Sequence, residues 1–326
     1  MTVHIADALD LDPASIRPVH GLRDSKPDID DLATLNHRYE NEGYLYFRRL
    51  IDSDVVRRAR VRMVAALERE GLARNDGDQV VWTGGDRPTL PEISPAYAGI
   101  VDEIVTDARV MPLLEKILGE PARTVPMVQY RAYKPHNKLG GVHQDGFYTP
   151  GIQGFRPLWI ALVDMEKAMG GLVLAPGHTK EGFFHNLAKQ PRSPIPTGVI
   201  PEDDWARAEY RAGDVVVLHP YTPHVGLPNT SGHLRLSIDT RVQSASNPST
   251  VVGHVVDVDL NTITLRFSKG EERQLQLDDS SFIRTGDNPS IRMSRQELVN
   301  EMQPGTQLLA AIEENHVLML RRADPG

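Results

Sequence analysis

The stretch DVVVLHPYTPHVGLPNTSGHLRLSID, residues 214–239, decides which fold we expect. It contains two short runs of β-branched and apolar residues, separated by a segment rich in Pro, Gly and Asn. Such a pattern predicts two strands joined by turns. Three comparable runs come earlier in the chain, at residues 124–134, 156–166 and 171–176. Several short strands at near-regular spacing predict a mainly β fold of the sandwich or open-barrel kind.

The first third of the chain is predicted to supply helices that flank this β structure. A polar segment at 28–41 predicts a short helix, and the alternating residues 43–51 predict a strand. Asp52 or Ser53 can cap a following helix. An apolar stripe predicts one more helix over residues 97–118, with Gly119 as its stop signal. Residues 74–95 and the Pro-rich insertion at 180–210 are expected to be long loops that determine specificity.

The segment after residue 249 is predicted to form a separate, small β-rich module. Residues 251–267 and 307–322 each predict a hairpin, and residues 294–302 predict a short capped helix. We therefore divide the chain into domains 1–249 and 250–326. The module carries no clustered ligands, so packing, a dimer contact or a wall over the functional site are its expected roles. A homodimer is left open.

Composition excludes several classes of partner and chemistry. The chain of 326 residues has 36 basic and 44 acidic residues and a formal net charge of -8, which gives a phosphate backbone little to attract it. No basic block favours anionic lipid, and no run approaches the ~18 apolar residues of a spanning helix. The chain has no cysteine, which excludes thiolate nucleophiles and iron–sulfur clusters. Together with an acidic N-terminal segment that does not look like a signal peptide, this leads us to expect a cytoplasmic protein without nucleic-acid or membrane partners.

The segment GGVHQDGFYTPG, residues 140–151, predicts a metal site. On a strand, His143 and Asp145 would project from the same face and could reach one ion. A third ligand would have to come from a neighbouring strand, where His219 and His224 are both available. Two imidazoles and one carboxylate occupy one face of an octahedral iron and leave three positions open.

The open positions suit a 2-oxo acid together with O2, and the sequence offers a partner for the free end of 2-oxoglutarate. That end is a carboxylate, which an arginine holds best through paired hydrogen bonds. Arg235 follows His224 by eleven residues, at the start of the next predicted strand. One turn and a strand return would bring it to the same cavity.

The order of these motifs resembles the phytanoyl-CoA dioxygenase family of Fe(II)/2-oxoglutarate-dependent oxygenases. HQD is followed by GGLVLAPGHTK and then by GDVVVLHPYTPHVGLPNTSGHLR, and the earlier NEGYLYFRRLIDSDVV is similar to the family's entry segment. The resemblance covers roughly residues 30–245 and leaves the C-terminal module outside it. It implies a double-stranded β-helix, the cupin-like jelly roll.

The resemblance also implies residue roles. His143 and Asp145 match the proximal metal ligands, and His224, rather than His219, matches the distal one. Arg235 matches the residue that holds 2-oxoglutarate. Further positions match the co-substrate pocket or could reach it: Gln144, Trp159, and either Lys134 or Tyr133.

The sequence departs from the family pattern at two places. The run Pro176–His178 is one residue shorter than usual, and Gly226 stands where a serine is frequent. Neither change touches the metal set. Halogenating relatives lack the carboxylate, so the presence of Asp145 argues against halogenation.

The activity implied is oxidation, by default hydroxylation, of a small-molecule metabolite, with 2-oxoglutarate converted to succinate and CO2. Two other hypotheses are a cupin-type metalloenzyme that does not use 2-oxoglutarate and a non-catalytic jelly roll that binds or senses a ligand. Neither the substrate nor the choice among hydroxylation, desaturation, epoxidation and cyclisation follows from the sequence.

Overall fold

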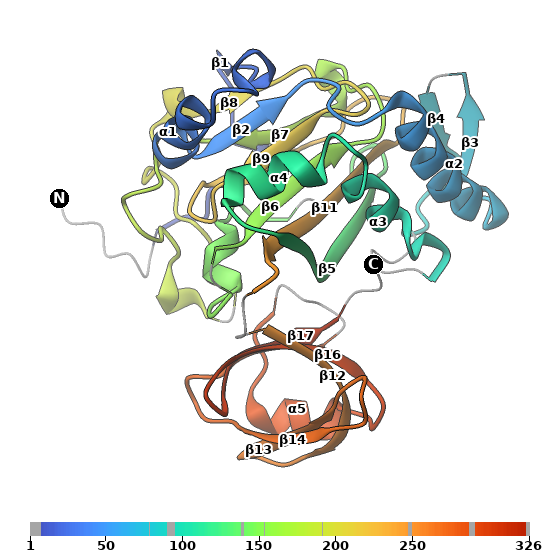
Figure 1. Ribbon diagram of the computed structural model, residues 1–326. Coiled ribbons are helices and arrows are strands. Elements are labelled where there is room, and N and C mark those ends of the chain that lie inside the picture. The colour runs from blue at the N-terminus through green and yellow to red at the C-terminus, as the bar shows by residue number, and fades with distance from the viewer. Residues whose placement is uncertain are drawn as a thin grey trace.

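Two facing sheets with flanking helices and a six-stranded C-terminal sheet make up most of the protein, as the computed structural model shows (Figure 1). The structure describes residues 8–323, apart from 78, 90–94, 138–139, 153, 191, 247–249 and 287–290. The five-stranded sheet has the order β2 (Tyr44–Phe47), β9 (Val215–Leu218), β6 (Arg156–Ala161), β11 (Arg235–Ser244), β5 (Ala122–Tyr133). The four-stranded sheet has the order β1 (His20–Gly21), β8 (Ala206–Arg207), β7 (Gly171–Leu174), β10 (His224–Leu227).

The strand order identifies the two sheets as a jelly roll. We count eight paired segments in chain order: β5, the segment at His143, β6, β7, β8, β9, β10 and β11. The segment at His143 is held beside β10 by a single antiparallel bridge to His224. One sheet then has the order 1-8-3-6 and the other 2-7-4-5, with β2 and β1 added at the edges. The antiparallel pairs 1–8, 2–7, 3–6 and 4–5 thus lie alternately in one sheet and the other, as in a double-stranded β-helix.

The strands predicted at residues 124–134, 156–166 and 171–176 are confirmed as β5, β6 and β7, and the two in residues 214–239 as β9 and β11. β6 and β9 are almost continuously buried, since helices cover one face of their sheet and the second sheet covers the other. The edge strand β5 is mostly half-buried. The very short strands β1, β8 and β10 lack enough residues for a periodic pattern. They were not individually predicted.

Helices from the first third of the chain pack on the outer face of the five-stranded sheet (Figure 1). They are α1 (Leu32–Glu42), α2 (Ser53–Arg69), α3 (Ile100–Val105) and α4 (Met111–Leu118). Asp52 caps α2, as expected, by accepting a hydrogen bond from the backbone N–H of Asp54. The prediction of one helix over 97–118 was wrong, because Pro112 lies in the first turn of α4 and begins a new helix. Residues 73–82 form a hairpin, β3 (Ala73–Asp76) and β4 (Gln79–Trp82), where a loop was expected.

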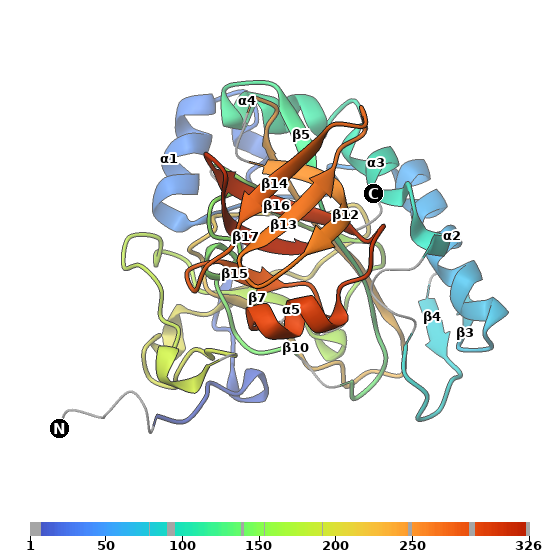
Figure 2. The same cartoon turned by 90° about the horizontal axis from the view of Figure 1, so that it is seen from below.

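The C-terminal sheet closes into a small barrel below the jelly roll (Figures 1 and 2). Its strands are β12 (Thr250–Val258), β13 (Thr262–Arg266), β14 (Glu272–Gln276), β15 (Phe282–Arg284), β16 (Gln307–Glu313) and β17 (His316–Arg322). Both predicted hairpins are present, and a parallel bridge between β14 and β17 completes the ring. The predicted helix is α5 (Arg295–Glu301), and Ser294 and Glu297 form its capping box.

The barrel has an apolar core of its own and a second apolar cluster shared with the jelly roll. Val125 and Met127 of β5 and Phe155 pack there against Leu309 of β16 and Met319 of β17. Gly151 approaches the barrel so closely that a Cβ at this position would lie 2.8 Å from Cδ1 of Leu318. The module is therefore fixed against the jelly roll at the edge formed by β5. The predicted boundary at residue 249 lies outside the described residues.

Among the residues that the structure describes, no helix has the length and apolar character needed to cross a membrane.

Candidate metal and co-substrate site

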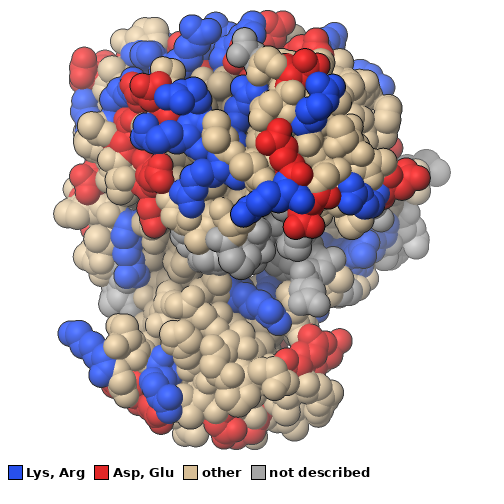
Figure 3. Space-filling view, turned by 90° about the vertical axis from the view of Figure 1, so that its right-hand side faces the viewer, with Lys and Arg blue, Asp and Glu red and all other residues tan. Residues whose placement is uncertain are grey.

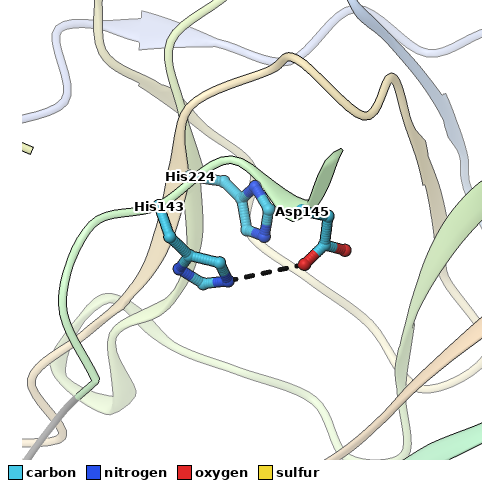
Figure 4. A group of neighbouring side chains, drawn as sticks. All are labelled: His143, Asp145 and His224. Atoms are coloured by element: carbon cyan, nitrogen blue, oxygen red, sulfur yellow. Dashed lines mark ion pairs between the residues drawn. The ribbon is translucent and has the colours of Figure 1, made fainter. Parts of the chain in front are cut away.

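Three side chains that are distant in sequence converge between the two sheets (Figure 4). One ligand atom from each of His143, Asp145 and His224 lies within 4.8 Å of the other two. Nε2 of His143 is 3.6 Å from Oδ1 of Asp145. These spacings are short enough for all three atoms to coordinate one ion.

Backbone pairing sets the positions of the two histidines. The N–H of His143 donates to the carbonyl oxygen of His224 at 3.1 Å, and the N–H of His224 donates back at 2.9 Å. Asp145 does not continue a strand, contrary to our expectation, but begins a 3-10 turn (Asp145–Tyr148). Gly146 allows this turn, because a Cβ there would be 3.2 Å from the carbonyl oxygen of Pro220. The acid therefore turns back towards the imidazoles.

The outer nitrogens of both imidazoles bind backbone carbonyls. Nδ1 of His143 lies 3.0 Å from the oxygen of Gly141, and Nδ1 of His224 lies 2.9 Å from the oxygen of Thr222. A carbonyl can only accept, so each Nδ1 carries the proton and each Nε2 keeps a free lone pair. The donor set therefore fits a divalent metal that takes two neutral imidazoles and a carboxylate.

The charge states suit the same arrangement. Burial, with the neighbouring His224, lowers the pKa of His143 to about 3, so its imidazole is neutral at ordinary pH. Burial alone would raise the pKa of Asp145. The guanidinium of Arg241 and the two imidazoles outweigh that effect and hold this pKa well below its usual value. Asp145 is therefore a carboxylate.

Arg241 is a site residue that our sequence analysis missed. Its Nη2 donates to both carboxylate oxygens of Asp145, at 3.1 and 3.2 Å, and its Nη1 donates to the carbonyl oxygen of Met127 at 3.1 Å. The side chain is only 7% exposed. A signal was available, because polar residues alternate on one face of β11: Arg235, Ser237, Asp239 and Arg241.

The three side chains open into a cavity of about 960 Å³. This is at the upper end of the usual range for small-molecule sites, with room for a co-substrate and a second molecule. Arg235, Tyr133 and Trp159 line the same cavity, as does part of the 180–210 insertion, including Ile195. None of the described residues of 74–95 lines it, so the expectation that this segment determines specificity has no support here.

Arg235 is buried at 2% exposure, and its guanidinium lies over the ring of Tyr133 at 4.4 Å. Among the described residues, both of its hydrogen bonds leave from Nη1, to the carbonyl oxygens of Met169 at 2.9 Å and Leu227 at 2.7 Å. A Cβ at Gly226 would be 2.9 Å from Nη2, so the glycine gives the guanidinium room. Burial lowers the pKa of Arg235 to about 10, and the group stays cationic. Its position fits a carboxylate partner.

Two of the residues expected at the co-substrate pocket lie elsewhere. The side-chain amide of Gln144 is buried, and its nitrogen, Nε2, donates to the carbonyl oxygens of Gly182 and Tyr221 at 2.8 and 2.7 Å. Lys134 points to the surface and donates to the carbonyl oxygen of Arg87 at 2.7 Å. Neither residue lines the cavity, so the structure corrects both expectations. Short-range motif matching could not reveal these backbone partners.

His219 does not join the metal group. Its Nδ1 accepts a hydrogen bond from the backbone N–H of Tyr221 at 3.2 Å, and its ring packs against Tyr39 with 5.2 Å between ring centroids. Of the two candidates for the third ligand, the structure brings His224 to His143 and Asp145.

The family of the chain follows from its similarity to known proteins. The phytanoyl-CoA dioxygenase (PhyH) family matches residues 39–237, more than half of the chain. The chain belongs to this family. The match includes His143, Asp145, His224 and Arg235, and it ends before Arg241. As a member, the chain is an Fe(II)/2-oxoglutarate-dependent oxygenase with O2 as the other co-substrate. The alternatives of another cupin-type enzyme or a non-catalytic jelly roll are not favoured.

Two relatives whose names state an activity have similar sequences. The 1-deoxypentalenic acid 11-beta-hydroxylases of Streptomyces exfoliatus and Streptomyces arenae are 28% and 27% identical over 241 residues. Each alignment covers 69% of this chain and 85% of the relative.

The solved structure of EctD from S. alaskensis with 2-oxoglutarate and 5-hydroxyectoine is a more distant neighbour. It is 16% identical, covers 74% of this chain and 84% of EctD, and has a TM-score of 0.49. Because that score is below 0.5, the fold assignment relies on the strand order described above.

Proposed function

We propose that this enzyme hydroxylates a small-molecule metabolite, with His143, Asp145 and His224 as ligands of Fe(II). In this proposal Arg235 holds the far carboxylate of 2-oxoglutarate. The observation that carries it is the convergence of ligand atoms from His143, Asp145 and His224 within 4.8 Å of one another, with Nδ1 of both imidazoles bonded to backbone carbonyls. The default outcome, hydroxylation, is also the activity in the names of the two Streptomyces relatives.

The residues of this chain would bind, orient and exclude water. The backbone carbonyls of Gly141 and Thr222 fix the ring orientations, and Arg241 fixes the acid. The guanidinium of Arg235 would orient 2-oxoglutarate through a charge-assisted pair. Iron and 2-oxoglutarate together would supply the oxidising chemistry, with release of succinate and CO2. Burial of the site would keep water from competing with the substrate.

The test is formation of succinate from 2-oxoglutarate, with and without Fe(II), in wild type and in Arg235→Ala. We expect succinate only with Fe(II). We expect the apparent KM for 2-oxoglutarate to rise about 10- to 100-fold in the variant, since a hydrogen bond to a charged group is lost. Arg131→Ala is a matched control, because Arg131 lines the same cavity but is paired with Asp239 at 2.8 Å. Succinate formation without Fe(II), or an unchanged KM in Arg235→Ala, would overturn the proposal.

We also propose that residues 1–249 and 250–326 are two domains, because the barrel has its own apolar core, which includes Leu265, Leu275 and Leu308. Cooperative thermal unfolding of the isolated segment 250–326 would support this division, and a fragment without structure would contradict it. A cytoplasmic location and a homodimer remain predictions. Cell fractionation and the mass in solution test them.

A further inference from the structure

The C-terminal barrel places two buried arginines in the wall of the metal cavity. Arg284 ends β15 and is 7% exposed, and Arg321 lies on β17 and is 4% exposed. Both line the cavity that also contains His143 and His224. The barrel lies below the jelly roll in Figure 1 and in front of it in Figure 2. The module is therefore part of the site's wall.

Contacts through one tyrosine connect Arg284 to the metal group. Nη1 of Arg284 donates to the carbonyl oxygen of Tyr148 at 3.1 Å, and its guanidinium lies 4.6 Å from the centre of the Tyr148 ring. That ring is 6.3 Å from the ring of His143. Nε of Arg284 is buried and has no hydrogen-bond partner among the described residues. This atom is thus available to donate to water or to a bound ligand.

Among the residues that the structure describes, positive charges outnumber negative ones in the cavity wall, although the whole chain carries a net charge of -8. Seven Lys and Arg residues line it there, against four Asp residues. Three of these acids are already engaged by cations in ion pairs: Asp239 with Arg131, Asp145 with Arg241, and Asp10 with Lys189. The fourth, Asp12, accepts from the backbone N–H of Ala14. On the face in Figure 3, by contrast, the two signs are interspersed.

The guanidinium groups also act on one another. Burial, followed by the charge of Arg321, lowers the pKa of Arg284 to about 9, and Arg241 contributes in the same direction. Buried cations that lie close together cost free energy, and an anion that binds beside them lowers that cost. The arrangement is thus suited to an oxyanion that enters the cavity.

The co-substrate does not account for the positive charge of Arg284 and Arg321. The carboxylate of 2-oxoglutarate is assigned to Arg235, which precedes Arg241 by six residues on β11, roughly 20 Å along a strand. Arg284 is close enough to Arg241 for their charges to interact. Arg284 and Arg321 also lie outside the family match at 39–237, so they are features of this chain's added module.

We propose that Arg284 and Arg321 bind an oxyanion of the substrate, a carboxylate or a phosphate, and so hold the molecule with its oxidisable carbon near the metal. The inference rests on the proposed function, because it assumes that the cavity receives a substrate beside 2-oxoglutarate. Both oxyanions match the paired donors of a guanidinium.

The test is calorimetric titration of the full chain, saturated with Zn(II) and 2-oxoglutarate so that the Arg235 end is filled. Three probes share one apolar ring: cyclohexanecarboxylate, cyclohexyl phosphate and uncharged cyclohexanecarboxamide. In wild type we expect at least one anion to bind about tenfold more tightly than the amide. The tighter of the two anions identifies the substrate class.

Substitutions of the two arginines test whether they cause the tighter binding of the anionic probes. Arg284→Met and Arg321→Met should bring the anion-to-amide ratio close to one, while Arg284→Lys should retain part of it. Arg322→Met is the matched control, because Arg322 is adjacent on β17 but exposed, with its Nε bonded to the carbonyl oxygen of Thr285. It should leave the ratio unchanged.

Two outcomes would overturn the inference: equal binding of all three probes by wild type, or a preference for anions that survives both Met substitutions. Binding of 2-oxoglutarate is measured in the same samples and should be unchanged in the barrel variants. If wild type binds no 2-oxoglutarate, the proposed function fails. If 2-oxoglutarate binds but the anion preference is absent, only the role of Arg284 and Arg321 fails.

Discussion

Both carboxylate oxygens of Asp145 accept hydrogen bonds from Nη2 of Arg241, at 3.1 and 3.2 Å. The acid of the metal group is thereby fixed to β11, the strand that also carries Arg235. One strand thus positions both the carboxylate proposed to bind the metal and the residue proposed to hold the co-substrate.

We predict that Arg241→Met weakens metal binding more than 2-oxoglutarate binding. Loss of the guanidinium frees the Asp145 carboxylate to rotate, and loss of such a supporting partner typically costs about 10- to 100-fold in metal affinity. Titration of the chain with Fe(II) under anaerobic conditions measures the effect. Arg131→Met serves as the control, and an Fe(II) affinity equal to that of wild type in Arg241→Met would show that the pair does not support the metal.

Gly43 is predicted to be intolerant of a side chain. It ends α1 with φ +82, and a Cβ there would meet Oγ1 of Thr222 and lie 2.8 Å from Cγ2 of Thr179. Gly119 ends α4 with φ +76 and has nothing within 4 Å of the same position. Gly119→Ala should therefore lower the free energy of unfolding by about 1–2 kcal/mol from the left-handed backbone alone.

Gly43→Ala should lower the free energy of unfolding by more than Gly119→Ala does, because its new methyl group also conflicts with Thr222 and Thr179. The thermal unfolding midpoint and denaturant titration of both variants measure the difference. Equal losses would mean that Thr222 and Thr179 move aside at no cost.

His219 should make the protein less stable in acid. Burial, followed by the charge of Arg156, lowers its pKa to about 4, while the unfolded chain has the ordinary value of about 6.5. The unfolded state therefore binds the proton more readily, and stability falls as the pH drops from 7 towards 4.

Between pH 7 and pH 5 the contribution of His219 amounts to about 1–2 kcal/mol. The comparison is the free energy of unfolding of wild type and His219→Gln at both pH values. The free energy of unfolding should fall more for wild type than for His219→Gln when the pH is lowered from 7 to 5. Equal decreases in the two proteins would contradict the lowered pKa of His219.

The sequence was sufficient to predict the jelly roll and the convergence of His143, Asp145 and His224. β-branched runs such as Val215–Leu218 are buried on both faces, so local composition and tertiary environment agree. His143 and His224 were recognisable because motif spacing in the chain reflects strand pairing in the fold. Gln144 and Lys134 were assigned wrongly, since their partners are backbone carbonyls of loops that no local pattern positions.

The contribution of the barrel could not be predicted in detail. Arg284 reaches the cavity only because β15 pairs with β17 and the barrel docks on β5. These are long-range contacts between segments that each look like ordinary surface hairpins. A wall over the site was one of three roles expected for this module, and the cavity lining supports that one.

The central claim is that His224, and not His219, completes an Fe(II) site with His143 and Asp145 that accepts 2-oxoglutarate. The most direct measurement is the visible absorption band that forms when a 2-oxo acid chelates Fe(II), recorded without O2 in wild type, His224→Ala and His219→Ala. We predict that the band appears in wild type and His219→Ala and is lost in His224→Ala. A band that persists in His224→Ala, or that is lost only in His219→Ala, would contradict the account.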